Sequence, residues 1–454
     1  MLGPHSLTRT MCFPAFPRDG RSGDSERECL TRTLARRGTR WNAPAVAGVK
    51  RRRTLTPEQD LSYRRLFIAL VAALSAVACG DQSAANVAPT ESVPVVVDPT
   101  PGVTAALTIN LNALPNYANP AWPVHYDAAT RGQSNAPADN PVTDKGATLG
   151  RVLFHDRRLS INNTTSCASC HGRSLGFTDS ARFSVGFNTV DRTDAHSMRL
   201  TNARFYAPGT AFWDRRAASL EAQSTQPIAH AIEMGFDAAH GGLDAAIARM
   251  NGQKYYPELF RFVFGDTAIT VTRIQRALAQ YVRSIVSIDS RFDQGFSRAF
   301  TAGVPDRGLS APFPSLTAEE NRGKTLFVTS PQQGGAGCVA CHVAPTFALA
   351  ADSRGNGLDP NESRVFKSPS LKSVGVTGPY MHDGRFRTLE AVVEHYVSGI
   401  QPGPALDNRL RLPGGAPMRL NLSGGDKAAI VAFLRTLTDT SLATNPAFAS
   451  PFRP

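Results

Sequence analysis

Apolar residues recur at spacings of three and four positions in two stretches of the chain, residues 274–285 and 430–437. This spacing places the apolar side chains on one face of a helix. Loops that contain glycine and proline separate such stretches, and no series of alternating apolar and polar segments predicts a set of strands. The fold class that we predict is therefore mainly α.

A five-residue pattern occurs twice. Residues 150–154 read GRVLF and residues 323–327 read GKTLF. Each copy predicts a helix. The second copy follows Thr317 and Glu320, which form a capping-box pattern in which each side chain bonds the backbone amide of the other residue. The shared position of the two copies, ahead of the same chemical motif, favours an internal duplication.

That motif is CxxCH. Its residues are Cys167, Cys170 and His171 in the first copy and Cys338, Cys341 and His342 in the second. The spacing is the attachment signature of c-type haem, because two thiols on a tight turn bond the porphyrin vinyl groups and the imidazole that follows binds the iron. A zinc site or a redox dithiol would leave each histidine unexplained. We therefore predict two covalently bound haems c, one in each of two cytochrome c-like domains over residues 107–310 and 311–454.

The other three cysteines all lie upstream, and Cys79 ends an apolar run. This run, residues 66–78, follows two arginines and closes with Ala-Val-Ala, which is typical of a secretory signal peptide; we assign it residues 61–79. The run is too short to span a membrane. Ordinary signal-peptidase cleavage and lipoprotein processing, which would acylate Cys79, both fit the pattern. Either route predicts an exported, periplasmic protein, tethered to the membrane if Cys79 is acylated.

The basic charge of the chain belongs mostly to its first part. Residues 1–78 hold 14 Lys and Arg against 6 Asp and Glu, and the remaining residues hold 35 Lys and Arg against 31 Asp and Glu. Most of the formal net charge of +12 therefore lies in residues 1–78. We therefore expect no nucleic-acid partner. Residues 1–60 precede the signal peptide, which indicates a start codon assigned too early or a disordered extension. Residues 80–106 are rich in Ala, Val, Pro, Thr and Ser, as in a flexible linker.

Between the two haem motifs lie residues that an electron carrier does not need. They are Trp213, Gln223, Pro227 and Glu233. In order and spacing they resemble the bacterial di-haem cytochrome c peroxidases and the related MauG-like proteins, and the resemblance covers roughly residues 140–400. In that family the first haem is the peroxidatic one, the glutamine and glutamate line its distal pocket, and the tryptophan lies between the haems. The resemblance implies these roles here.

The chemistry of these residue types agrees with those roles. Cleavage of an iron-bound peroxide needs a base that takes the proton from the inner oxygen and returns it to the outer oxygen. A carboxylate such as Glu233 in a poorly hydrated pocket can do both steps. Gln223 can orient peroxide by hydrogen bonding, Pro227 would keep the pocket wall rigid, and Trp213 offers an oxidisable ring along the electron path.

The sixth ligand of the second haem distinguishes the subtypes of the family, which have Met in the peroxidases and Tyr in MauG. Alignment from the segment that contains Met381 places this ligand at Tyr396. The residues at 389, 392, 393 and 396 also form a helical stripe that turns Tyr396 inward, with His395 about 100° round the helix. Met381 and His395 stay as rival ligands. A phenolate stabilises ferric iron, whereas a thioether favours ferrous iron.

The chain departs from the family pattern in two places. Many family peroxidases carry a histidine after the first haem motif that caps this iron at rest, and here Phe187 stands in its place. His196, later on the same loop, is a second residue that could swing in. MauG has a tryptophan two residues before the second motif, where this chain has Ala336, which argues against a protein substrate of the MauG type.

The resemblance also implies a calcium ion between the domains, held largely by carbonyl oxygens. Thr377 and Pro379 occupy the matching positions, while His196 replaces the usual asparagine. The histidines at 125, 155, 230 and 240 match no family position and are interpreted as ordinary core or surface residues.

Three functions follow as hypotheses. The first is a periplasmic peroxidase that reduces hydrogen peroxide with electrons from a small redox protein, a cytochrome c or a cupredoxin, passed through the second haem. The second is a MauG-like oxidase that stores two oxidising equivalents and oxidises a protein or a small molecule. The third is a non-enzymatic di-haem electron carrier, against which Glu233 and Gln223 argue. A homodimer is among the expected assemblies.

Overall fold

The computed structural model describes residues 11–12, 29–30 and 100–454. The N-terminal extension, the signal peptide, Cys79 and most of the linker therefore lie outside the described residues or in their gaps. The chain divides into two compact units, Met1–Ser92 and Val93–Pro454. In the first unit, strands β1 (Met11–Cys12) and β2 (Cys29–Leu30) pair in antiparallel fashion.

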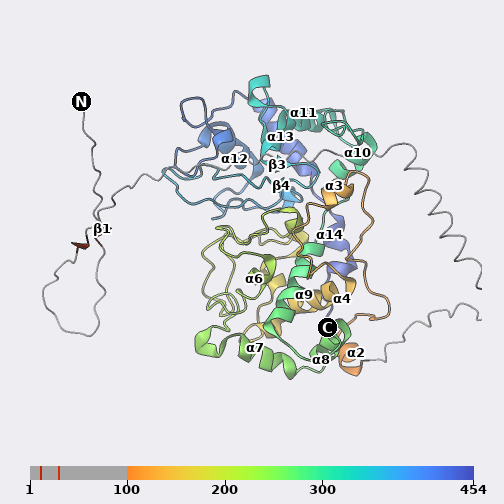
Figure 1. Ribbon diagram of the computed structural model, residues 1–454. Helices are drawn as coiled ribbons and strands as arrows, with labels where there is room; N and C mark the ends of the chain where they lie inside the picture. Colours follow the sequence, from red (N-terminus) through yellow and green to blue (C-terminus); the bar gives the residue numbers. More distant parts are fainter. Residues whose placement is uncertain (1–10, 13–28, 31–99) are drawn as a thin grey trace, which may run out of the picture. The chain divides into compact units, whose positions relative to one another are not determined.

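The second unit is mainly helical, which confirms the predicted fold class (Figure 1). Its helices are α2 (Pro101–Ala106), α3 (Ala128–Arg131), α4 (Asp144–His155), α5 (Cys167–Cys170), α6 (Leu220–Ser224), α7 (Gly242–Asn251), α8 (Tyr255–Phe264), α9 (Val271–Ser284), α10 (Arg291–Ala299), α11 (Ala318–Val328), α12 (Leu389–Glu394), α13 (Gly424–Thr436) and α14 (Ser441–Thr444). Strands β3 (His342–Val343) and β4 (Ala348–Leu349) form a short antiparallel pair. None of the helices described in this part of the chain is long and apolar enough to cross a membrane.

Short turns of 3₁₀ helix connect these elements. They are η1 (Arg157–Leu159), η2 (Arg173–Leu175), η3 (Ala203–Phe205), η4 (Ala238–His240), η5 (Pro331–Gln333), η6 (Cys338–Ala340), η7 (Val374–Val376), η9 (Asn408–Leu410) and η10 (Pro446–Phe448). One wider turn, η8 (His395–Gly399), is a π-helix that continues α12.

Two large hydrophobic cores hold the second unit together. The first core is built mainly by α4, α7, α8 and α9, and the second by α10, α11, α12 and α13. These two sets of helices lie at opposite ends of the unit in Figure 1. The chain passes from the first core to the second between Ile285 and Phe292, and its last part returns, because Leu442 and Phe448 belong to the first core. The predicted domain boundary between residues 310 and 311 stays a prediction.

The repeated five-residue pattern lies on equivalent helices. Gly150 is on α4, which packs along α9, and Gly323 is on α11, which packs along α13. A Cβ atom at Gly150 would overlap the carbonyl oxygen of Ala277, and one at Gly323 would overlap that of Ala429. The same glycine in each copy therefore allows the same close approach of two helices. This shared geometry supports the predicted duplication.

The predicted capping box is confirmed at the start of α11. Thr317 Oγ1 accepts a hydrogen bond from the backbone amide of Glu320 at 3.2 Å, and Glu320 Oε2 accepts one from the amide of Thr317 at 2.7 Å. These bonds satisfy amides that the first turn of a helix leaves free. The helix that begins here packs along α13 and contacts η6, which carries the second CxxCH motif.

Candidate active site

The first CxxCH motif lies on the single turn of α5. A capping box between Ser166 and Ser169 fixes this turn, and Ser169 Oγ accepts from the Ser166 amide at 3.0 Å. His171 Nδ1 lies 3.0 Å from the carbonyl oxygen of Phe177 and 3.2 Å from Ser197 Oγ. A bond from Nδ1 to a carbonyl orients the ring and leaves Nε2 for a metal. Burial lowers the pKa of His171, which favours the neutral imidazole that metal binding requires.

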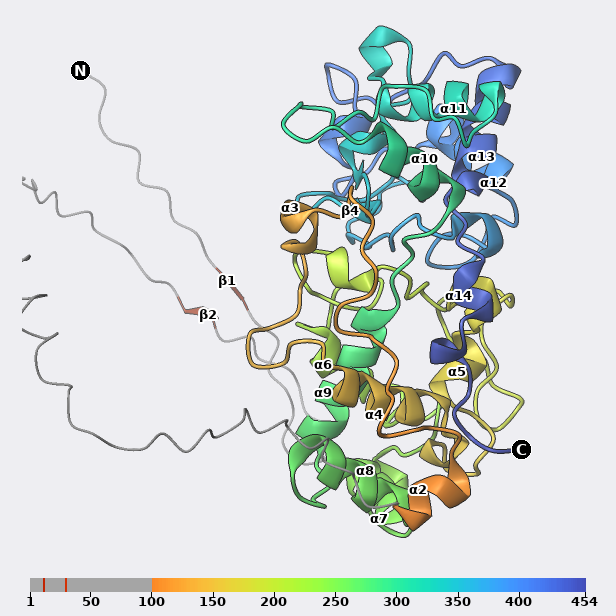
Figure 2. The ribbon, with the colours of Figure 1, turned by 90° about the vertical axis from the view of Figure 1, so that its right-hand side faces the viewer.

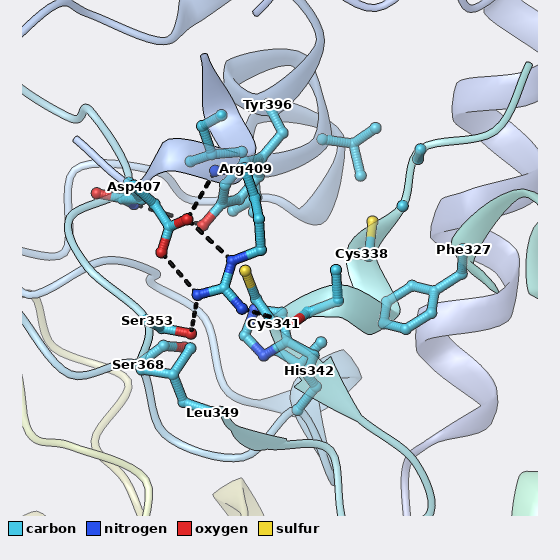
Figure 3. A pocket seen from close by; sticks show the side chains of 18 of the residues that line it. Phe327, Cys338, Cys341, His342, Leu349, Ser353, Ser368, Tyr396, Asp407 and Arg409 are labelled. Atoms are coloured by element: carbon cyan, nitrogen blue, oxygen red, sulfur yellow. Dashed lines mark hydrogen bonds and ion pairs between the residues drawn. The ribbon is translucent and has the colours of Figure 1, made fainter. Parts of the chain in front are cut away.

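The second motif lies on η6 and at the start of β3, on the wall of a cavity of about 780 Å³. Figure 3 shows its two thiols and the imidazole of His342 in this cavity, with Phe327 and Leu349 among the apolar side chains around them. Burial lowers the pKa of His342 to about 4, so this imidazole is also neutral. Two thiols, a neutral imidazole and a largely apolar cavity fit a c-type haem in volume and in donor set.

Arg409, which forms an ion pair with Asp407, also holds the loop of the second motif. Arg409 Nη1 donates to the carbonyl oxygen of Ala340 at 2.8 Å, and its Nε donates to Asp407 Oδ1 at 2.9 Å (Figure 3). Nη2 reaches Ser353 Oγ at 3.2 Å. No pattern in the sequence predicted this arrangement, because the arginine lies 69 positions from the loop that it holds.

The π-helical turn η8, which continues α12, brings Tyr396 to the same cavity. All four residues of the predicted stripe, at 389, 392, 393 and 396, line the cavity, as does Met381. His395 points elsewhere: it is 5% exposed and its Nε2 lies 3.1 Å from the carbonyl oxygen of Asn356. Two of the three rival ligands, Tyr396 and Met381, therefore face the space that a haem would fill.

A single amide lies beside both of these residues. Asn356 Nδ2 is 3.4 Å from Met381 Sδ and 3.5 Å from Tyr396 Oη. Burial raises the pKa of Tyr396 to about 12, so the free phenol is neutral at physiological pH. Asn356 was not predicted from the sequence, since nothing local distinguishes it from other loop asparagines.

The carboxyl group of Glu233 lies near the first motif. Burial raises the pKa of the Cys167 thiol to about 12 and that of Cys170 to about 11, and the charge of Glu233 adds to both rises. The Glu233 side chain is 31% exposed, and burial raises its own pKa, opposed in part by His230 and Arg216. Such an environment keeps the carboxyl group protonated up to a higher pH than that of an exposed glutamate.

His230 was interpreted as an ordinary histidine, yet the structure places it beside Glu233. Its Nδ1 lies 3.7 Å from Glu233 Oε1 and accepts from the Glu233 backbone amide at 3.3 Å. The His230 amide in turn donates to the carbonyl oxygen of Pro227 at 3.3 Å. Pro227 and Glu233 therefore belong to one compact loop. Gln223 precedes this loop at the end of α6, and its side chain is half-buried.

Phe187 lies next to the same loop. Its amide donates to the carbonyl oxygen of Ile232 at 3.1 Å, and its ring occupies the space that a Cβ at Gly235 would need. A phenyl ring cannot bind iron. His196 is 5% exposed, and its Nδ1 lies 3.1 Å from the carbonyl oxygen of Ala181, so existing bonds hold its ring in place.

Trp213 connects the two regions. Its Nε1 donates to the carbonyl oxygen of His196 at 2.7 Å, and His196 Nε2 lies 3.4 Å from Thr178 Oγ1, seven residues after the ligand of the first motif. The indole also lines the cavity of the second motif and meets the ring of His382 edge-on at 6.4 Å. An oxidisable ring thus lies between the loop that follows the first motif and the cavity of the second motif.

A buried arginine, Arg199, lies beside one of the positions that the resemblance matches to calcium ligands. Arg199, 7% exposed, donates to Thr377 Oγ1 at 2.5 Å and to the carbonyl oxygen of Ser370 at 2.8 Å. Pro379 lines the cavity of the second motif. Within residues 100–454 no group of three or more His, Cys, Asp or Glu side chains is arranged to hold a metal ion. A guanidinium at Thr377 would repel a divalent cation there.

Comparison with known proteins bears on these observations. Residues 144–299 match the family model described as di-haem cytochrome c peroxidase. The chain is 34% identical over 319 residues to the methylamine utilization protein MauG of Methylorubrum extorquens, an alignment that covers 66% of this chain and 80% of that protein. The chain belongs to the di-haem cytochrome c peroxidase and MauG family.

The proteins similar to this chain include both subtypes of the family, the peroxidases and the MauG proteins. The cytochrome c551 peroxidase of Nitrosomonas europaea is 30% identical over 337 residues, covering 70% of this chain and 86% of that one. The crystal structure of a MauG-like protein associated with microbial copper homeostasis has a TM-score of 0.57 at 28% identity and covers 74% of this chain and 98% of that one. The diheme peroxidase BthA of Burkholderia thailandensis, 20% identical with a TM-score of 0.53, shares the fold.

Membership of this family makes the protein an oxidoreductase with two c-type haems, as predicted. The two CxxCH motifs are the residues that would attach them. The roles of Glu233, Gln223, Pro227, Trp213 and Tyr396 remain predictions.

Proposed function

We propose that the protein is a periplasmic di-haem c peroxidase that reduces hydrogen peroxide to water at the first haem, with electrons passed through the second haem. Its relatives include proteins named cytochrome c peroxidase. The observation that supports the proposal most directly is Glu233, a carboxyl group with a raised pKa close to the thiols of Cys167 and Cys170. An electron carrier has no use for such a group.

When bound, the haem of the first motif would supply the iron and the redox chemistry for peroxide reduction. Glu233 would take the proton from one oxygen of peroxide and deliver it to the other oxygen, which would leave as water. The half-buried amide of Gln223 orients peroxide, and Pro227 holds the loop that carries Glu233. Over the full cycle one peroxide, two protons and two electrons give two water molecules.

The same proposal explains the loop around Phe187. Because a phenyl ring stands where many relatives carry a capping histidine, and because His196 is tied by its own hydrogen bonds, the first haem stays accessible to peroxide in the oxidised protein. Trp213 relays electrons to it from the second haem.

The alternative is a MauG-like oxidase of a protein or small molecule. Tyr396, on the wall of the second cavity, favours this alternative, because a phenolate ligand stabilises ferric iron and would make the second haem a store of oxidising equivalents. Ala336 argues against a protein substrate, since no oxidisable ring stands at that position.

Several finer features belong to the proposal. The electron donor is a small redox protein, a cytochrome c or a cupredoxin, and the two haem domains span residues 107–310 and 311–454. Export relies on the signal peptide at 61–79, with a lipid anchor on Cys79 or simple cleavage before it, and a homodimer is the expected assembly. A calcium ion between the domains, held largely by carbonyl oxygens at Thr377 and Pro379, also belongs to the proposal.

Stopped-flow spectroscopy of the fully oxidised protein mixed with hydrogen peroxide tests this function. A peroxidase that is open at rest should show rapid spectral change at the first haem without prior reduction, followed by turnover when a reduced donor is added. A protein with two attached haems that shows neither change would contradict the proposal. Oxidation of an added small molecule without turnover of a donor would favour the MauG-like alternative.

A further inference from the structure

Four polar side chains gather beside the cavity of the second motif. They are Tyr206, Thr210, Arg215 and Lys367. Lys367 is 7% exposed and lines the same cavity as Cys341 and His342. Its Nζ donates to the carbonyl oxygen of Thr210 at 3.1 Å and lies 4.9 Å above the ring of Tyr206. The carbon of the Arg215 guanidinium lies 6.0 Å from the same ring.

Three polar atoms of this cluster are buried without a hydrogen-bond partner. Among residues 100–454, Arg215 Nε, Tyr206 Oη and Thr210 Oγ1 find none. Buried polar atoms in native proteins are almost always paired with protein, water or a ligand. Three of them in one place therefore indicate a bound group with several acceptor atoms.

The charge of the cluster specifies what kind of group this is. No carboxylate within residues 100–454 forms an ion pair with Lys367 or Arg215, although Arg215 does donate to the carbonyl oxygen of Ser353 at 3.0 Å. Burial, together with the like charge of Arg215, lowers the pKa of Lys367 to about 8. A buried cation, Lys367, and a half-buried cation, Arg215, that repel each other favour an anion beside them.

The backbone holds this arrangement in a conformation that few residues adopt. Arg215 has φ of +62°, in the left-handed region where glycine is the usual occupant. The Lys367 amide donates to the carbonyl oxygen of Trp213 at 2.7 Å, which ties the two segments together. A strained, non-glycine residue next to a ligand cavity is typical of a functional constraint.

We propose that Lys367 and Arg215, assisted by the hydroxyls of Tyr206 and Thr210, receive the propionate carboxylates of the haem attached at Cys338 and Cys341. The inference rests on the second haem that the proposed function requires. Two cations match the two propionates of one haem, and the hydroxyls supply the remaining donors. By placing fixed positive charge near the iron, the cluster favours the ferrous form of this haem and keeps its propionates ionised.

The test is a redox titration of the second haem, after mass spectrometry has confirmed two attached haems. We compare the parent with Lys367→Gln and Arg215→Gly; the glycine also accepts the positive φ without strain. Removal of one charge should shift the ferric to ferrous ratio about tenfold toward ferric at a fixed potential, the effect of a unit charge that acts over roughly 10 Å at an effective dielectric constant of about 20. The potential should also become pH-dependent, because a propionate without its cation titrates nearer to neutral pH.

Two controls separate this role from simple structural support. Arg364→Gln removes an exposed cation three residues from Lys367 and should leave the potential unchanged. Lys367→Arg, which keeps the charge, should restore the parent potential. If Lys367→Gln fails to retain the second haem, Arg215→Gly still gives the measurement.

An unchanged potential with an unchanged pH dependence in Lys367→Gln and Arg215→Gly would overturn the inference and show that water satisfies the cluster. The titration uses no peroxide. A protein that does not react with peroxide but shows these shifts would refute the proposed function and keep this inference.

Discussion

Replacement of Glu233 by glutamine is the sharpest test of the proton-transfer step. The two side chains have the same shape, so Glu233→Gln should retain both haems and the local loop. The amide cannot take a proton from peroxide, however, and loss of a general acid–base group typically costs a factor of about 10² to 10⁴ in rate. His230 Nδ1 lies 3.7 Å from Glu233 Oε1 and can carry some protons in its place, so we expect a loss near 10² to 10³.

This loss corresponds to about 3 to 4 kcal/mol in the activation barrier. Because burial raises the pKa of Glu233, the parent enzyme should lose activity on acidification at a higher pH than an ordinary glutamate would predict, as the carboxylate becomes protonated. This acid limb should be absent from the rate profile of Glu233→Gln. The double variant Glu233→Gln with His230→Gln should be slower still.

The assay is stopped-flow measurement of the reaction of ferric protein with peroxide between pH 5 and 8, a window set by ordinary carboxyl and imidazole pKa values of roughly 4 to 7. Glu319→Gln is the matched control, since Glu319 is exposed and lies in the first turn of α11, a helix of the second core. Its rate should equal that of the parent. A Glu233→Gln protein that carries two haems and reacts at the parent rate would refute the assignment of Glu233.

Three other predictions follow from the same structure. Phe187→His should cap the first haem, so that the oxidised variant shows a low-spin first haem and reacts with peroxide only after partial reduction, whereas an unchanged spectrum would place residue 187 away from the iron. Tyr396→Met should raise the potential of the second haem by on the order of 0.1 V, and Tyr396→Phe should open the site; identical spin state and potential in the Phe variant and the parent would remove Tyr396 as ligand. Gly150→Ala and Gly323→Ala should each lower the free energy of unfolding by about 2 kcal/mol or more in denaturant titrations, because their methyl groups overlap backbone carbonyls, whereas Gly424→Ala, with open space around it, should change it by less than about 1 kcal/mol.

The helices and the haem motifs could be predicted from the sequence because their signals are local. The stretch at 274–285 became α9, the capping box at Thr317 began α11, and the predicted stripe of α12 lines the cavity. Each of these patterns spans fewer than twenty residues, within the reach of helical periodicity. The contacts that could not be predicted are those between segments far apart in the chain.

Arg199 and Lys367 illustrate why the rest could not be predicted. Arg199 bonds Ser370, 171 positions away, and Lys367 bonds Thr210, 157 positions away. No spacing rule connects such segments, because the contact exists only after both cores have formed. His230 shows the same limit at short range, since only the fold of its loop turns the ring toward Glu233.

The return of the C-terminus to the first core sets an order of events during biogenesis. Tyr117 Oη donates to the carbonyl oxygen of Ala447 at 2.5 Å, Arg151 Nε donates to that of Ala449 at 2.8 Å, and α14 lies beside η2, just after the first motif (Figure 2). Phe448 packs on Phe177, whose carbonyl oxygen holds His171.

A ribosome makes these last residues only after both CxxCH motifs have left it. The surroundings of the first motif therefore lack these contacts until residues 447–449 have been synthesised. Removal of the last twelve residues should therefore disrupt the surroundings of the first motif, although the second motif is nearer in sequence. The second hydrophobic core should stay intact.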